Sequence, residues 1–562
     1  METEIVVIPF HGQGHIFPCI ELCNQLARLN LKTTALIPSP ISSSLRLHPL
    51  VQIMETSTHS PPPPPPQWPE NSPSPSFPAM LDPLESILLE RVAAGKSLPT
   101  VVIVDTMMSR LLETCRKFKI PAVSFFTSGA CAAAMEHALW MNSPDKVTQG
   151  QVLTLNGLPG EMALSSYELK RFFFRPPHPP PNPTSIESQR VFGNKNQAFP
   201  GWGSNPPPLP ENMSLFHKEM PFDRKLPPPL PESMMSSAGK MFSGQGPLPP
   251  PPQPGGPPRW MEETQGSVVL MINTCSDLER PFLDYMADVA GKPVWGVGPL
   301  LPSSFWDWTH GEFHDSAVRA TRDSSVSEEE VRHWLDNMPH GSVLYVAFGT
   351  EVGPTRTELA ELAVALEETH RPFIWAIQRN AGRRMPPPPP GIAADVEELR
   401  PPPPGIAAEG VEGVDNMSIL PEGFEQRVGS RGLVIHGWAP QLMILNHTAT
   451  GGFLSHCGWN SMVEAVCAGV PLLAWPIRGD QHYNAKMVAS WLKIGSIIMD
   501  TEMDGEISKD VILAGIERVM SAVEARRQVE SIRKIFSGGF PASSRSALDD
   551  FRQLVQQLNQ QE

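Results

Sequence analysis

Residues 438–481 decide the fold; they read WAPQLMILNHTATGGFLSHCGWNSMVEAVCAGVPLLAWPIRGDQ. An apolar strand is predicted over 452–455. It runs into the turn His-Cys-Gly-Trp-Asn-Ser, and a helix over 461–468 and a second apolar strand over 471–474 follow. Strand, helix and strand in this order, with continuously apolar strands, are typical of a parallel sheet covered by helices.

The same alternation extends through the rest of the chain in two sets. The first set predicts strands at 5–9, 33–37, 101–104, 123–126 and 268–272, with helices at 15–29, 110–118 and 129–141. The second set adds strands at 343–348, 373–377, 433–436 and 496–499, with helices at 356–369, 481–492 and 509–523. Two sets predict an α/β protein of two doubly wound, Rossmann-like domains that face a cleft. Ligands of such sheets bind at the carboxyl ends of the strands.

Composition restricts the partners and the compartment. The 562 residues carry a net charge of −15, which disfavours nucleic acid as a partner. The acidic start and the lack of a stretch of about 18 apolar residues predict neither a secretion signal nor a membrane span. Seven scattered cysteines without a C-x-x-C pair indicate buried thiols of a reducing, cytoplasmic compartment. We expect a monomer.

Proline is concentrated in the segments 61–83, 176–258 and 386–404, and the third repeats PPPPGIAA at 387–394 and 401–408. Such runs favour polyproline II. They are solvated insertions, docking ligands for SH3, WW or profilin-like domains, or an artefact of sequence assembly. Around them we expect an N-terminal Rossmann-like domain (1–300), a linker (301–335), a C-terminal Rossmann-like domain (336–540) and a last helix (541–562) that returns to the N-terminal domain.

The turn after strand 452–455 has two local interpretations. A glycine-containing turn that opens a helix exposes backbone N–H groups to an anion, and His456, Asn460 and Ser461 stand where their donors would meet a phosphate. Alternatively, Ser461 and Glu464 form an S-x-x-E capping box, which any helix can use.

Residues 438–481 also resemble, from end to end, the 44-residue signature box of the plant family 1 UDP-dependent glycosyltransferases. The pattern W-x-P-Q-x-x-I-L-x-H, H-C-G-W-N-S-x-x-E, G-V-P and W-P-x-x-x-D-Q is complete. Further stretches resemble other parts of that family: IPFHGQGH (8–15), VIVD (102–105), FFT (125–127), NTCSDLE (273–279), VWGVGPL (294–300) and VLYVAFGT (343–350).

The resemblance implies a GT-B fold in which the N-terminal domain binds the acceptor and the C-terminal domain binds the UDP-sugar donor, together with a set of donor-site roles. Trp438 would stack on uracil, with the Ala439 backbone at its edge. The ribose would be held by Gln441 and Glu464, and the diphosphate by Thr350, His456, Asn460 and Ser461 around Gly458. The sugar would be held by Trp459, Asp480 and Gln481, with help from Thr127. A terminal glutamine such as Gln481 goes with glucose donors in this family, so UDP-glucose is the expected co-substrate, without a further cofactor. Taken singly, a tryptophan such as Trp438 is more often a core residue than a stacking platform, and Asp480 would serve simply as the cap of the helix over 481–492.

The catalytic residues are expected at the first sheet. His15 lies where the first strand turns into a helix, and a helix N-terminus disfavours the imidazolium form. Asp105 ends a later strand, and an aspartate behind a histidine fixes its tautomer. The resemblance implies that this pair is the catalytic dyad of an inverting transfer. No metal-ligand spacing is present, since His11 and His15 straddle a glycine turn without a third ligand.

Acceptor identity stays open at this stage. Phe125, Met135, Trp140 and residues 172–174 form an apolar wall for a flavonoid, phenolic or terpenoid acceptor, or else belong to the core, and segment 176–258 is a candidate lid. Three functions remain: an O-glucosyltransferase, a C-glycosyltransferase or enzyme for another UDP-sugar, and an interaction protein that carries polyproline tracts on a vestigial enzyme.

Overall fold

The computed structural model describes residues 3–38, 47–56, 83–142, 150–173, 257–306, 323–350, 353–378, 420–498 and 507–561. All of these belong to one compact unit. The proline-rich segments lie outside the described residues, apart from Pro83, Pro257 and Pro258 at their ends. The predictions of docking tracts and of a lid at 176–258 therefore fall outside the described residues.

The first sheet has seven parallel strands in the order β3-β2-β1-β4-β5-β8-β9. Its strands are β1 (Glu4–Ile8), β2 (Lys32–Pro38), β3 (Val51–Thr56), β4 (Val101–Asp105), β5 (Ala122–Phe126), β8 (Val269–Ile272) and β9 (Val294–Gly296). Strand β4, with sequence VVIVD, is buried throughout, as expected for a strand that is covered by helices on both faces. The two strands that the hydrophobic pattern did not predict, β3 and β9, are the two edges of the sheet. Strand β3 carries polar residues (VQIMET), β9 has only three residues, and neither shows a continuous apolar run.

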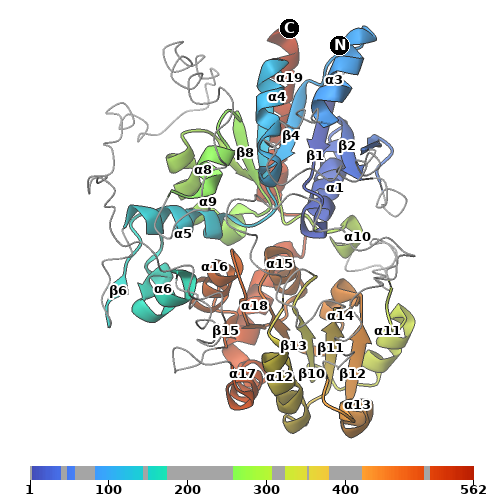
Figure 1. Ribbon diagram of the computed structural model, residues 1–562, viewed down its shortest axis with the longest axis vertical. Helices are drawn as coiled ribbons and strands as arrows, with labels where there is room; N and C mark the ends of the chain where they lie inside the picture. Colours follow the sequence, from blue (N-terminus) through green and yellow to red (C-terminus); the bar gives the residue numbers. More distant parts are fainter. Residues whose placement is uncertain are drawn as a thin grey trace, which may run out of the picture. The chain divides into compact units, whose positions relative to one another are not determined.

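Helices connect these strands and flank the sheet (Figure 1). They are α1 (Gln13–Arg28), α3 (Pro83–Ala93), α4 (Leu111–Lys117), α5 (Ala130–Met141), α6 (Ser166–Phe173), α8 (Arg259–Glu263), α9 (Ser276–Ala290) and α10 (Ser303–Trp306). A two-stranded antiparallel pair, β6 (Val152–Leu153) and β7 (Leu164–Ser165), precedes α6.

The second sheet has six parallel strands in the order β12-β11-β10-β13-β14-β15. They are β10 (Val343–Ala347), β11 (Phe373–Ile377), β12 (Gly432–His436), β13 (Thr450–Ser455), β14 (Leu472–Ala474) and β15 (Gly495–Ile497). Both sheets reverse their strand order once, between β1 and β4 in the first and between β10 and β13 in the second. Ligand sites of doubly wound sheets form at such reversals.

The helices of the second half begin at local capping signals in two places. Helix α11 (Glu328–Asp336) starts with a capping box of Ser327 and Glu330, and α12 (Arg356–Glu368) with one of Thr355 and Glu358. The other helices are α13 (Phe424–Val428), α14 (Gln441–Asn446), α15 (Trp459–Ala468), α16 (Gln481–Lys486), α17 (Lys509–Ser521) and α18 (Val523–Arg533). The helix predicted at 481–492 is α-helical only through Lys486 and continues as a π-turn, Met487–Trp491.

The two halves share one hydrophobic core. The largest cluster of buried apolar side chains runs from Ile5 and Phe125 of the first sheet to Tyr345 of the second. The Trp491 indole donates to the carbonyl of Leu278 at 3.1 Å. A largely buried ion pair joins Lys486 to Glu168, with 2.7 Å between Nζ and Oε1.

The last helix, α19 (Ala542–Gln561), packs against β9 and α9 of the first half. Its Ser543 donates to Asp277 at 2.7 Å, and its Asn559 bonds both Thr3 and Thr100. The two ends of the chain therefore lie side by side (Figure 1).

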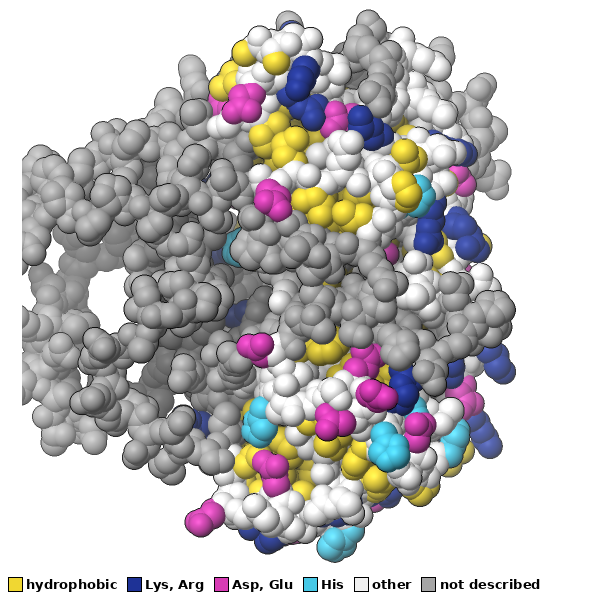
Figure 2. Space-filling model, turned by 90° about the vertical axis from the view of Figure 1, so that its right-hand side faces the viewer, with side chains coloured by type: hydrophobic (Ala, Val, Ile, Leu, Met, Phe, Trp, Pro, Cys, Tyr) yellow, Lys and Arg dark blue, Asp and Glu magenta, His cyan; other side chains and the backbone are white. Residues whose placement is uncertain are grey.

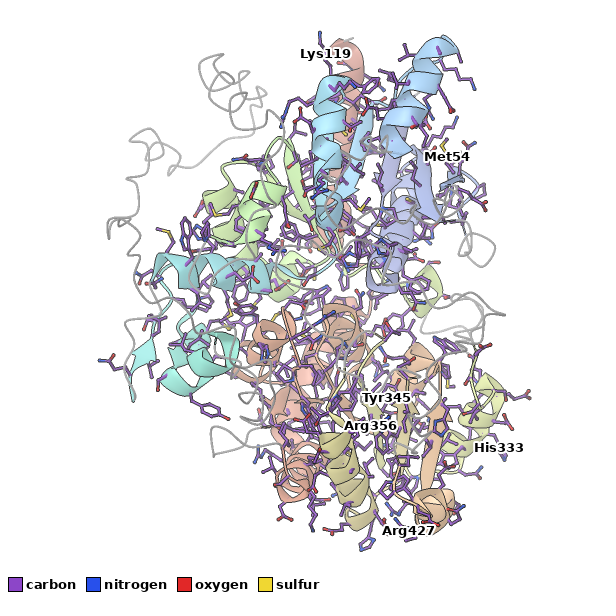
Figure 3. The ribbon with its side chains drawn as sticks, in the orientation of Figure 1. Met54, Lys119, His333, Tyr345, Arg356 and Arg427 are labelled. Carbon is purple, nitrogen blue, oxygen red and sulfur yellow. The ribbon has the colours of Figure 1, made fainter. Side chains whose placement is uncertain are left out.

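Charged groups of both signs are interspersed on the described part of the face in Figure 2. Exposed ion pairs include Arg427 with Glu367 at 2.7 Å and Lys509 with Glu368 at 2.8 Å. Arg427 lies on the short helix α13 (Figure 3). Exposed pairs of this kind contribute little to stability because water and salt screen them, so the fold is stabilised mainly by its apolar core. All seven cysteines are buried thiols, and none of the described helices is long and apolar enough to cross a membrane.

Gly129, just before α5, supports the contact between the halves. A Cβ atom at this position would lie 2.2 Å from the ring of Trp459. We predict that Gly129→Ala lowers the free energy of unfolding by about 2 kcal/mol, the usual cost of overpacking a tight contact. Urea unfolding measures this loss. The control is Gly160→Ala, because a Cβ there has no atom within 4 Å, and equal stability of the two variants would contradict the packing described.

Candidate active site

His15 and Asp105 meet at the strand-order reversal of the first sheet. Strands β1 and β4 are parallel neighbours, with Ile8 opposite Val104, so the residues that follow them are brought together. The Nδ1 atom of His15, in the first turn of α1, lies 2.7 Å from Oδ2 of Asp105, the last residue of β4. The Asp105 side chain is completely buried, whereas the His15 side chain is 24% exposed. The imidazole is thus the part of the pair that a substrate can reach.

Backbone N–H groups hold the Asp105 carboxylate in place. Oδ2 accepts from Phe10 N at 3.3 Å, and Oδ1 accepts from Met107 N at 3.0 Å. The same carboxylate accepts the hydrogen bond from His15. A neutral His15 must therefore carry its proton on Nδ1. The lone pair of the ring is then on Nε2, the nitrogen that would take up a proton.

Thr127, predicted as a sugar contact, lies beside the dyad. It follows β5, the strand next to β4, and its Oγ1 is 3.0 Å from the Nδ1 of His15. His15, Asp105 and Thr127 therefore lie together where the three adjacent strands β1, β4 and β5 end.

The strand-order reversal of the second sheet carries the turn 456–458. Cys457 has a φ of 59°, in the left-handed region that non-glycine residues rarely adopt, and such strain is found at functional sites. Cβ atoms at Gly349 and Gly458 would lie 2.8 and 2.5 Å from Nε2 of His456, so both glycines make room for this ring. Burial lowers the pKa of His456 to about 4, which leaves it neutral at pH 7.

The capping-box interpretation of Ser461 and Glu464 is wrong. Helix α15 begins at Trp459 with Gly458 as its N-cap, three residues earlier than that box requires, and no side chain caps it. Glu464 is buried and accepts from Gln441 Nε2 at 2.7 Å, and the same amide donates to Ser461 Oγ at 3.1 Å. The N-terminus of α15 is therefore suited to an anion.

The predicted ribose pair, Gln441 and Glu464, is brought together by this bond. The Gln441 amide is oriented from the other side by Tyr345 of β10, whose hydroxyl donates to Oε1 at 3.3 Å. Tyr345 lies within the second sheet, and its side chain is buried (Figure 3).

The remaining donor residues of the second sheet lie at or beyond its strand ends. Trp438 follows β12 and is half-buried, and its backbone N–H donates to Asp323 O at 3.0 Å. Ala439 is buried, and Thr350, after β10, is exposed. Trp438, Ala439 and Thr350 therefore lie at the same end of the second sheet, where its strands finish. Within the described part of the chain, no direct hydrogen bond joins any two of them.

Asp480 and Gln481 open helix α16. Asp480 occupies the N-cap position, yet its side chain makes no capping bond. Its Oδ2 instead accepts from Ser128 of the first half at 2.9 Å and from Asn484 at 3.2 Å, and burial raises the pKa of Asp480. Oε1 of Gln481 accepts from the backbone N–H groups of Ile477 and Arg478, so its NH₂ group is the part available to a ligand.

Two predicted donor residues are engaged with the first half. The Trp459 indole is buried and donates to Asn273 O at 2.8 Å. The Asn460 amide donates to Gly14 O at 2.9 Å. A contribution of Trp459 to donor binding would therefore come from its backbone N–H.

Sequence reasoning missed Ser128, Tyr345 and Asn484, together with the amide of Asn273. Ser128 and Asn273 come within two residues of strand ends, which was the available signal. Of the proposed acceptor wall, Phe125 and Met135 are fully buried core residues, whereas Trp140 is half-buried and stacks edge-on against His137. The side chains of residues 172–174 lie outside the described part. Within the described residues no group of three or more His, Cys, Asp or Glu is arranged to hold a metal ion.

Comparisons with known proteins point to glycosyltransferases with the same fold. Residues 421–529 match the family model "UDP-glucoronosyl and UDP-glucosyl transferase". UDP-glycosyltransferase 92A1 of Arabidopsis thaliana is 26% identical, over 97% of this chain and 96% of its own length. The flavonol 3-O-glucosyltransferase UGT89B1 of the same plant is 25% identical, over 94% of this chain and 91% of its own. The crystal structure of a UGT transferase from Siraitia grosvenorii in complex with UDP covers 99% of this chain and 100% of its own, with a TM-score of 0.61 at 20% identity.

The fold is therefore GT-B, with two Rossmann-like halves, as the sequence predicted. Over almost its whole length the chain is similar to plant UDP-glycosyltransferases, as residues 438–481 predicted, and it is a glycosyltransferase enzyme.

Glu136, on α5, allows the burial and the negative charge near Asp480 to be tested by changing the pH. Burial raises its pKa to about 7, and the negative charges of Asp480 and Glu263 add to the rise. Between pH 4.5 and 7 the folded protein holds a proton that the unfolded chain has lost, so this group's contribution to stability falls as the pH rises. The loss is at most about 3 kcal/mol.

We therefore predict that Glu136→Gln raises the unfolding midpoint at pH 8 but not at pH 4.5. Thermal unfolding at the two pH values measures the difference. Glu113→Gln, at an exposed position, is the control and should behave alike at both. An equal shift of Glu136→Gln at both pH values would contradict the raised pKa.

Proposed function

We propose that this enzyme is a UDP-glucose-dependent O-glucosyltransferase that acts with inversion on a hydroxyl group of a small lipophilic acceptor of the flavonoid, phenolic or terpenoid type. The observation that carries the proposal is the 2.7 Å bond between Nδ1 of the partly exposed His15 and the buried Asp105. A buried carboxylate behind an accessible imidazole is the arrangement of a general base.

In the proposed reaction, Nε2 of His15 removes the proton of the acceptor hydroxyl. The oxygen then forms a bond to the anomeric carbon of UDP-glucose as the bond from that carbon to the diphosphate breaks, which gives a β-glucoside and UDP. Asp105 stabilises the imidazolium that forms. The N-terminus of α15 would stabilise the negative charge on the departing diphosphate.

Glucose as the donor sugar is supported by the family tendency at Gln481 and by the similarity to UGT89B1, which is named as a flavonol 3-O-glucosyltransferase. The same dyad would serve C-glycosylation or another UDP-sugar, and acid hydrolysis of the product would separate an O- from a C-glycoside. A cytoplasmic location remains part of the proposal, based on the cysteine pattern, and a monomer remains part of it as an expectation.

The first experiment is UDP release by the purified protein with UDP-glucose and a panel of flavonoids, simple phenols and terpenoid alcohols. Release only with an acceptor supports the proposal and begins to identify the substrate. UDP binding without release from any acceptor contradicts the acceptor class. Absence of both release and UDP binding would favour the interaction protein, which pull-down with SH3 or WW domains would test.

His15→Ala should lower kcat by about 100- to 10,000-fold, the usual contribution of a positioned general base. UDP affinity, measured by calorimetry, should stay unchanged. His333→Ala, at an exposed position on α11, is the matched control (Figure 3). Full activity of the His15 variant would contradict the proposed mechanism, and loss of UDP affinity would show that the effect is structural.

A further inference from the structure

A row of polar groups extends along the edge of the first sheet beyond the dyad. Strands β4, β5 and β8 are consecutive neighbours, and they end at or next to Asp105, Thr127 and Asn273. Asn273 has no role in the proposed mechanism, although its side chain is almost completely buried. A buried primary amide must have both its donors and its acceptor satisfied, so its partners define what it does.

The Asn273 side chain connects three parts of the fold. Its Nδ2 donates to Thr127 O at 3.1 Å and lies 3.5 Å from Oδ1 of Asn460 at the start of α15. Its Oδ1 accepts from Leu300 N at 2.8 Å, and its backbone carbonyl accepts the Trp459 indole. One residue of the first half thus contacts both residues that open helix α15 of the second.

These bonds close a ring through the proposed base. Asn460 donates to the carbonyl of Gly14, the residue before His15. On the other side, Thr127 Oγ1 contacts Nδ1 of His15. The path His15–Thr127–Asn273–Asn460–Gly14 therefore returns to the turn that carries the base, and it includes the helix end where the diphosphate would bind.

We propose that Asn273 is a positioning residue for the transfer reaction: its side-chain amide fixes His15 relative to the N-terminus of α15. Attack at the anomeric carbon requires the base and the leaving diphosphate to be held in one geometry, and a misplacement of about 1 Å costs about 100-fold in rate. This inference rests on the proposed function of His15, and the experiment separates the two.

The test is Asn273→Asp in the full chain. The variant keeps the shape and the acceptor for Leu300 N, but its ionised carboxylate cannot donate to Thr127 O or to Asn460. We expect kcat to fall about 10- to 100-fold while the Kd of UDP changes less than about threefold. Asn337→Asp is the control, because the exposed Asn337 donates locally, to His333 O, on the surface of α11; it should keep wild-type kcat.

The pH profile gives a readout that a general loss of stability would not produce. A protonated carboxyl group regains a donor, and burial favours that form. The ratio of variant to wild-type kcat should therefore rise as the pH is lowered from 8 to 5.5. Because both proteins use His15 as the base, the effect of pH on that residue cancels in the ratio. A ratio that stays flat contradicts the positioning role.

Asn273→Ser keeps the inference testable if the aspartate variant does not fold. Its hydroxyl is too short to reach both acceptors and adds no charge, so kcat should again fall with unchanged UDP affinity. Wild-type kcat in either folded variant would overturn the inference. If these variants are active while His15→Ala is inactive, only the positioning role of Asn273 fails; if His15→Ala keeps its activity, the proposed function fails first.

Discussion

The parallel pairing of β1 with β4 is the constraint on which the candidate site depends. Because Ile8 lies opposite Val104, the chain leaves both strands at the same edge and the turn that carries His15 comes to rest on Asp105. Strand β5 adds Thr127 and β8 adds Asn273 to that edge. The second sheet repeats the arrangement between β10 and β13, where Gly349 leaves room for His456. The strand order therefore determines where the candidate site lies, and the side chains at the strand ends supply its functional groups.

Buried carboxylates hold the surrounding elements through long-range bonds. Glu279, which is fully buried on α9, accepts from the backbone N–H groups of Ala130 and Cys131 at 2.9 and 2.7 Å and so caps α5 from another helix. Burial raises the pKa of Glu279, and these N–H bonds oppose the rise. The start of α5 is thereby fixed next to Gly129, where Trp459 packs. An acidic group far along the sequence thus orders the contact between the halves.

Much of the fold was predictable from sequence because central parallel strands are short continuous apolar runs. Strands β4 and β11 were predicted nearly to the residue, whereas the edges β3 and β9 were not, since edge strands need less apolar character. Local patterns misled at Ser461, where the glycine turn opens α15 earlier than the S-x-x-E spacing implies. The bonds of Asn273 to Asn460 and of Ser128 to Asp480 join residues 187 and 352 positions apart, and no local pattern reports contacts of that separation.

The return of α19 to the first half has a consequence for the order of assembly. Residues 542–561 bond Thr3 and Thr100 and cover β9, so the packing of the first sheet is completed by a segment that leaves the ribosome after the whole second sheet. Contacts of such high sequence separation slow folding, and the partly covered first sheet is exposed meanwhile. The first half therefore completes its packing only after the second half has been synthesised.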